Sequence, residues 1–176
     1  STRAYIESTD GFNRKKLKSY VDSLELEKNY IGLVAVGYSK VVSTGEKQNL
    51  INQMKAEGVE DFKIFPETEK NQYHSIIYIE PLTDQNRKVI GFDMSTEENR
   101  RQALDRARDL ATAAATAKVV LLQDPEPNLQ PGFLIYLPVY KDGKTPATLQ
   151  ARRENLIGYV YCPFRTKELL SATIKD

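Results

Sequence analysis

The chain has 176 residues, of which 40% are hydrophobic and 28% charged, enough to bury the core of one domain or of two small lobes. With 25 basic and 24 acidic residues, its net charge of +1 creates no overall field that attracts nucleic acid or an anionic membrane. The basic cluster at 14–18 is a single helix face, too small for a nucleic-acid surface. The single cysteine, Cys162, excludes an internal disulfide, and its apolar strand favours an inert buried thiol.

The first part of the chain shows a helical pattern, then a strand, then a second helix. Apolar residues recur at helical spacing from about Asn13 to Leu26, and the β-branched run from Ile31 to Ser39 predicts a buried strand. Ser43 and Glu46 have the spacing of a capping box, which predicts a helix that ends at Gly58.

The middle of the chain is predicted to contain two strands and the longest helix. Alternating or β-branched residues at 62–65 and 73–79 indicate the strands. The short element at 89–94 carries Asp93. It runs directly into a second Ser-x-x-Glu box, which ends at Glu98 and predicts the main helix from Ser95 to about Ala114.

The last third predicts paired strands at 118–123 and 133–140, a short helix at 148–155, another strand at 156–164 and a final helical turn at 168–174. Helices and strands suited to antiparallel pairing alternate through short loops. This pattern indicates an α+β fold with a central antiparallel sheet flanked by helices, the plan of a PAS-like fold.

Residues suited to catalysis or metal binding are scarce. His74 is the only histidine, and its place at a strand start favours a structural role. No cysteine pair offers a zinc site, and the isolated glycines lack the spacing of a phosphate-binding loop. Acidic residues of the main helix alternate with Arg101, Arg106 and Arg108, which is typical of a solvated ion-pair lattice. We therefore expect no enzymatic activity, no cofactor and no metal.

Asp93 is the strongest candidate for a binding residue. Its carboxylate stands where an apolar strand end meets a helix start, with Ile90, Phe92 and Met94 around it. Two roles remain open from the residues alone: contact with a ligand, or capping of the helix through the amide of Ser95 or Thr96.

Many segments in order resemble the CHASE domains, the extracytoplasmic sensory modules of histidine kinases, nucleotide cyclases and diguanylate cyclases. The resemblance covers nearly the whole chain. It is specific because many segments match in the same order, although no single segment would suffice. The segments are 18–24, 32–38, 58–66, 77–82, 90–101, 103–109, 115–119, 132–140 and 158–165.

The resemblance implies a stalk helix that leads into PAS-like lobes. Residues 1–28 would be the end of the stalk and an entry helix, 29–145 the membrane-distal ligand-binding lobe, and 146–176 a return strand and C-terminal segment. It also implies a piece of a longer receptor, a histidine kinase or cyclase, that senses a small molecule in the periplasm or outside the cell. The parent is expected to be a homodimer, held in the membrane by flanking helices that this chain lacks.

A second reading is a structural or dimerisation module that relays a signal from a partner protein without an occupied cavity. A cavity of several hundred Å³ on the helix-covered side of the sheet favours the sensor, and a closed core favours the relay.

In the plant cytokinin receptors, which belong to this family, the acid that matches Asp93 binds the polar edge of the ligand. The segment that matches 115–117 adds backbone and hydroxyl contacts, so the resemblance implies contacts from Thr116 and the backbone of Ala115. Asp93→Ala is then expected to lower ligand affinity by about 1.5–3 kcal/mol and to leave the fold intact. Strand alternation lets only about half of the candidate aromatic walls face one cavity. These candidates are Tyr73, Tyr78, Phe133 and Tyr136.

Overall fold

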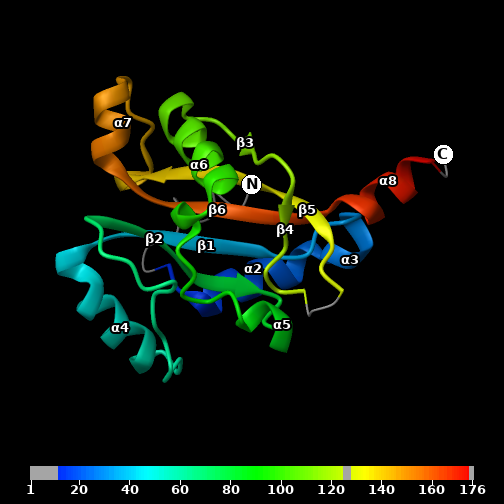
Figure 1. The fold of residues 1–176 in the computed structure, drawn as a ribbon, viewed down its shortest axis with the longest axis horizontal. Helices are drawn as coiled ribbons and strands as arrows, with labels where there is room; N and C mark the ends of the chain where they lie inside the picture. Colours follow the sequence, from blue (N-terminus) through cyan, green and yellow to red (C-terminus); the bar gives the residue numbers. More distant parts are fainter. Residues whose placement is uncertain (1–11, 125–127, 175–176) are drawn as a thin grey trace.

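The computed structural model describes residues 12–124 and 128–174, so the predicted stalk at Ser1 to Asp10 lies outside the described residues. Its centre is an antiparallel six-stranded sheet with the order β2-β1-β6-β5-β3, and β4 also pairs with β5 (Figure 1). The last long strand therefore lies in the middle of the sheet. The strands are β1 (Val36–Ser43), β2 (Gln72–Glu80), β3 (Ala114–Ala115), β4 (Val119–Val120), β5 (Pro131–Tyr140) and β6 (Leu156–Arg165).

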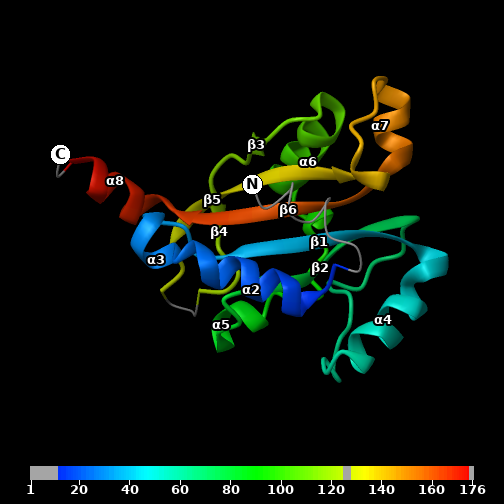
Figure 2. The same ribbon diagram turned by 180° about the vertical axis from the view of Figure 1, so that it is seen from behind.

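Helices cover both faces of this sheet. In Figure 1, α6 and α7 lie above the sheet and α4 and α5 below it, and the reverse view in Figure 2 shows α2 in front of β1 and β2. This α+β arrangement confirms the predicted PAS-like plan. The helices are α2 (Arg14–Leu24), α3 (Leu26–Asn29), α4 (Lys47–Ala56), α5 (Asp84–Arg87), α6 (Glu98–Leu110), α7 (Leu149–Asn155) and α8 (Thr166–Ile174), with 3-10 turns η1 (Thr44–Glu46), η2 (Met94–Thr96) and η3 (Lys141–Gly143).

Side chains alternate between the two faces of each strand, so the sheet separates two cores. On one face, Tyr136, Tyr159 and Tyr161 belong to a core that α6 covers. Ala103 and Ala107 of α6 are fully buried there, and their small size lets the helix lie close to the sheet.

The second core lies on the opposite face, under α2 and α4. Leu17 and Val21 of α2 and Leu50 and Met54 of α4 are buried against the sheet. Full burial of such a side chain stabilises the fold by roughly 1.5–3 kcal/mol, so these two amphipathic helices anchor the second face.

The start of the main helix differs from the prediction. Glu97 is its cap: the carboxylate accepts hydrogen bonds from the amides of Asn99 and Arg100, both at 2.9 Å. The predicted cap, Ser95, lies in η2 and donates its hydroxyl to Asp93 at 2.7 Å. The second capping box is therefore wrong, because another carboxylate engages the hydroxyl that would cap the helix.

Two other boundaries follow local rules. The first capping box is confirmed, with Ser43 N donating to the Glu46 carboxylate at 3.3 Å, and it opens η1, which continues into α4. The main helix ends at Leu110 instead of near Ala114. It stops there because Ala111 adopts a left-handed conformation, with φ of 51°.

Candidate ligand site

A short backbone ladder holds the segment that carries Asp93. On one side, Gly91 N donates to Ile76 O at 2.7 Å and Ile76 N donates to Phe92 O at 3.0 Å. On the other side, Phe65 N donates to Gly91 O at 3.1 Å, and Asp93 N donates to Phe65 O at 2.8 Å. The ladder fixes residues 91–93 between β2 and the segment that precedes it.

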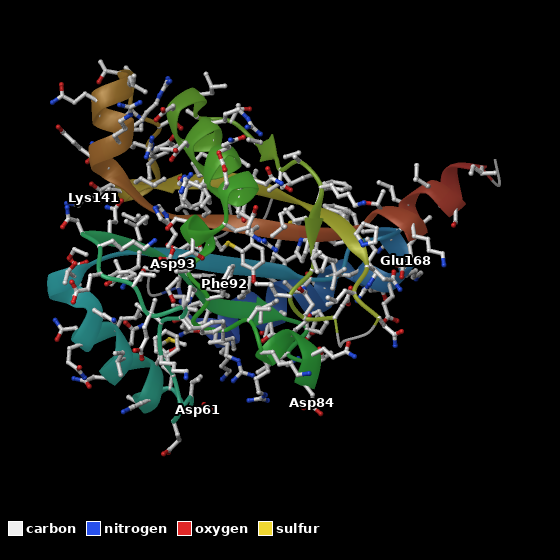
Figure 3. All side chains as sticks on the ribbon, viewed as in Figure 1. Asp61, Asp84, Phe92, Asp93, Lys141 and Glu168 are labelled. Carbon is white, nitrogen blue, oxygen red and sulfur yellow. The ribbon has the colours of Figure 1, made fainter. Side chains whose placement is uncertain are left out.

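The carboxylate of Asp93 is fully buried and has several partners. Its Oδ1 accepts hydrogen bonds from Ser95 N at 3.1 Å, Ser95 Oγ at 2.7 Å and His74 N at 3.0 Å. Lys70 Nζ lies 2.7 Å from Oδ2 and also donates to Ser95 Oγ at 2.8 Å. Asp93 therefore caps η2 and forms an ion pair with the loop before β2. Figure 3 shows it in the interior, next to Phe92.

These contacts also set the charge of Asp93. Burial raises the pKa of this carboxyl, but Lys70 and the hydrogen bonds from Ser95 and the backbone of His74 outweigh burial and hold the pKa below its usual range. The group is thus ionised at neutral pH. Its Oδ2 has Lys70 beside it but makes no hydrogen bond among the described residues, and the predicted ligand contact of Asp93 stays a prediction.

The other two predicted polar contacts serve the fold. Thr116 N donates to Leu134 O at 2.9 Å, and its Oγ1 accepts from Leu134 N at 3.0 Å, which extends the pairing of β3 with β5. Ala115 is exposed, and its carbonyl accepts a hydrogen bond from Arg106 at 2.6 Å. These groups therefore hold the sheet edge and α6 together.

The four predicted aromatic residues do not line a single cavity. Tyr136 lies in the core that α6 covers, whereas Tyr73 and Tyr78 belong to the core on the opposite face. Phe133 is half-buried and stacks on Phe164, with ring centroids 5.1 Å apart. Of the four, the structure places only Tyr136 beneath α6.

The cavity beneath α6, called the α6-side cavity below, is small. Phe92, Met94, Arg100 and Tyr161 are among the residues that line it, and its volume is about 10 Å³. A space of this size holds about one water molecule. The hydroxyls of Tyr136 and Tyr161 and the Nε of Arg100 are buried nearby without a hydrogen-bond partner among the described residues. This cavity is therefore too small for a larger ligand as it stands.

Arg100 is a buried charge that the sequence analysis missed. Its guanidinium donates to Val120 O at 2.9 Å, lies 3.3 Å from the Glu97 carboxylate and packs 5.6 Å from the centre of the Phe92 ring. Helical spacing could have predicted the burial of Arg100, because Arg100 precedes Ala103 by three positions and lies on the same buried face of α6.

A larger cavity opens at the outer edge of β2, the edge strand of the sheet, and is called the β2-edge cavity below. Its volume is about 350 Å³, within the usual range for small-molecule sites. Residues 77–79 of β2 form its floor, and residues from 58–65 and 82–90 form its two walls. Figure 3 shows Asp61 and Asp84, one from each wall, on this side of the molecule. No sequence motif marks this cavity, because distant segments form its walls.

Among residues 12–124 and 128–174, no group of three or more His, Cys, Asp or Glu side chains could hold a metal ion. No helix in this same part of the chain is long and apolar enough to cross a membrane. Cys162 is a free, half-buried cysteine, and burial raises the pKa of its thiol to about 12, so it stays protonated and unreactive at neutral pH.

Comparisons with known proteins identify the family. The model of the CHASE domain matches residues 10–176. A curated relative, Hybrid signal transduction histidine kinase A of Dictyostelium discoideum, is 26% identical over 119 residues. That alignment covers 65% of this chain and 6% of the kinase, so the chain spans a small fraction of the relative's length. Because the family match runs over almost the whole chain, the protein belongs to the CHASE domain family.

Proposed function

We propose that this chain is the small-molecule sensory domain of a membrane-anchored signalling receptor and has no catalytic activity of its own. Its membership of the CHASE family, a family of sensory domains, supports this role. The histidine kinase relative supports a histidine kinase as the parent protein, with a cyclase as the alternative. A periplasmic or extracellular location, flanking transmembrane helices and a homodimeric parent are parts of the same proposal.

The β2-edge cavity is the observation that carries the proposal. Its volume of about 350 Å³ suits a small metabolite, and it combines apolar side chains with a few charged groups, as ligand sites do. Val59 and Phe65 on one wall and Leu82 and Ile90 on the other are half-buried. A ligand would cover apolar surface that the fold has already grouped together.

The alternative is a structural or dimerisation module that relays a signal from a partner protein. The α6-side cavity favours this alternative, because it has room for about one water molecule. The two functions differ in one measurable property: whether a small molecule binds and stabilises the isolated domain.

Screening of metabolites by thermal shift and native mass spectrometry tests the proposal. A ligand present at about 100 times its Kd stabilises the folded state by about 2.7 kcal/mol, a shift of several degrees in Tm for a domain of this size. Val59→Trp, which places an indole in the wall of the β2-edge cavity, should abolish the shift. Leu149→Trp, at an exposed position on α7, should preserve it. If no metabolite binds, the relay function is favoured. If a ligand binds the wild-type chain and Val59→Trp equally well, the domain is a sensor but the assignment to the β2-edge cavity fails.

A further inference from the structure

We propose that the β2-edge cavity takes an amphipathic anion, a small molecule with a carboxylate or phosphate on a compact apolar body. This inference rests on the proposed function and adds the chemical class of the ligand. It draws on three features of the cavity: the half-buried apolar side chains on its walls, the charges on the same walls and a buried donor that makes no hydrogen bond.

The walls select an apolar body. Val59 and Phe65 on one wall and Leu82 and Ile90 on the other are half-buried, whereas Ile77 and Ile79 of β2 are buried in the two cores. Phe65 adds an aromatic ring, which packs against a neighbouring phenylalanine of the protein core. Among the described residues, no Asn or Gln side chain lines the cavity, so its polar side chains are mainly charged ones.

The walls carry more positive than negative charge. Lys63 lies on one wall, and Arg87 and Lys88 lie on the other. All three side chains are exposed, and in the described part of the chain none forms an ion pair. Asp61 and Asp84 line the same walls and are also unpaired, so the cations remain in excess. Cations held at fixed positions around a concave surface attract an anion and raise its local concentration.

Arg14 supplies a buried donor that makes no hydrogen bond. It lines the cavity from α2 and forms an ion pair with Glu80, with 3.7 Å between Nε and Oε1, but this Nε donates to no acceptor among the described residues. That oxygen also lacks a hydrogen bond, and Glu80 is not among the residues that line the cavity. Buried donors are nearly always satisfied in folded proteins. An anionic oxygen in the cavity would satisfy the Nε of Arg14, and a guanidinium favours carboxylate or phosphate partners.

Three probes of one shape and different charge test the inference: phenylpropionate, phenylpropanol and phenylpropylamine. Binding to the isolated domain is measured by calorimetry and by amide NMR shifts at constant ionic strength. We expect phenylpropionate to bind at least about tenfold more tightly than the alcohol, and the amine to bind most weakly. The amide shifts should cluster at 61–65, 77–79 and 87–90, and added salt should weaken binding of the anion only.

Matched charge variants locate the anion. The double variant Arg87→Gln/Lys88→Gln should lower the affinity for phenylpropionate about tenfold and leave that for phenylpropanol unchanged. Arg101→Gln/Lys144→Gln removes the same charge from exposed positions outside the cavity and should change neither affinity.

Several results overturn the inference: equal affinities for all three probes, tightest binding of the amine, no binding of phenylpropionate at its solubility limit, or shifts outside the cavity. Phenylpropanol binding lost in Val59→Trp, without any preference for the anion, would refute the ligand class and leave the proposed function standing. Failure of every probe and every screened metabolite would refute both.

Discussion

Asp93 receives four donors from three parts of the chain: Lys70 Nζ, the amide of His74, and the amide and hydroxyl of Ser95. Replacement by alanine would leave these donors without their common acceptor in a buried place. We predict that Asp93→Ala lowers the free energy of unfolding by about 2–4 kcal/mol, measured by urea denaturation at neutral pH. The structure thus argues against the expectation that this substitution leaves the fold intact.

A comparison variant separates burial from charge in this prediction. Asp105 is also an aspartate, but it is exposed, and its ion pair with Arg108 is 3.4 Å long. Asp105→Ala should change the free energy of unfolding by less than about 1 kcal/mol. If Asp93→Ala changed the free energy of unfolding by a similarly small amount, the donors around Asp93 would have found other acceptors. That result would favour a role of Asp93 in ligand binding alone.

His74 makes stability depend on pH. Burial, the largest effect, lowers the pKa of its imidazole to about 4, with Asp93 and Asp105 acting in the opposite direction and Lys70 and Arg108 adding to the decrease. Between pH 6.5 and 4 the unfolded chain therefore binds more protons than the folded one. The contribution of His74 to the free energy of unfolding therefore falls as the pH drops from 6.5 to 4, by at most about 1.4 kcal/mol per pH unit.

Urea denaturation at several pH values, with the His74→Gln variant as the comparison, measures this contribution. The wild-type chain should lose more stability than the variant between pH 6.5 and 4. The chain has no other histidine, so NMR of its imidazole reports the pKa directly. An imidazole that titrates near 6.5 in the folded domain would contradict the prediction.

At the scale of elements, the ladder around residues 91–93 depends on a glycine. Gly91 has φ of +97°, and a Cβ at this position would lie 2.0 Å from the carbonyl oxygen of Lys63. Both a left-handed conformation and a backbone contact oppose any side chain there. We predict that Gly91→Ala lowers the free energy of unfolding by at least about 2 kcal/mol, measured by thermal or urea denaturation.

The matched control is Gly45→Ala in η1, where a Cβ would meet no atom within 4 Å. That variant should stay within about 0.5 kcal/mol of the wild-type chain. Equal effects at the two glycines would show that the close approach of residue 63 to residue 91 does not stabilise the fold.

The whole molecule is organised around β6. This strand lies between β1 and β5 in the middle of the sheet, and α8 follows it directly. At the junction, Arg165 forms an ion pair with Asp124 at 2.5 Å, and its amide donates to Gly32 O at 2.8 Å. Asp124 follows Leu121 and Gln123, which line the α6-side cavity. The start of α8 is therefore tied to the loop beside that cavity.

The sequence alone determined most of the elements and the fold class. The predicted strand at 62–65 is wrong, because this segment forms only an isolated bridge from Phe65 to Phe92. The spacing of apolar residues along the chain shows which face of a helix or strand is buried. These spacings predicted helices and strands that match α2, α7, β5 and β6 closely. The order of these elements indicated the α+β, PAS-like sheet, and the distributed resemblance identified the CHASE family, which the family match confirms.

Only the tertiary structure decided how the polar groups pair and where the cavities lie. Lys70 and His74 reach Asp93 because β2 and residues 91–93 share a backbone ladder, and the same carboxylate takes the Ser95 hydroxyl away from α6. The β2-edge cavity likewise exists because two distant segments meet beside an edge strand. The spacing of apolar residues in the sequence indicates whether a residue is buried. Its hydrogen-bond partner, or the cavity it lines, depends on which segments the fold brings into contact.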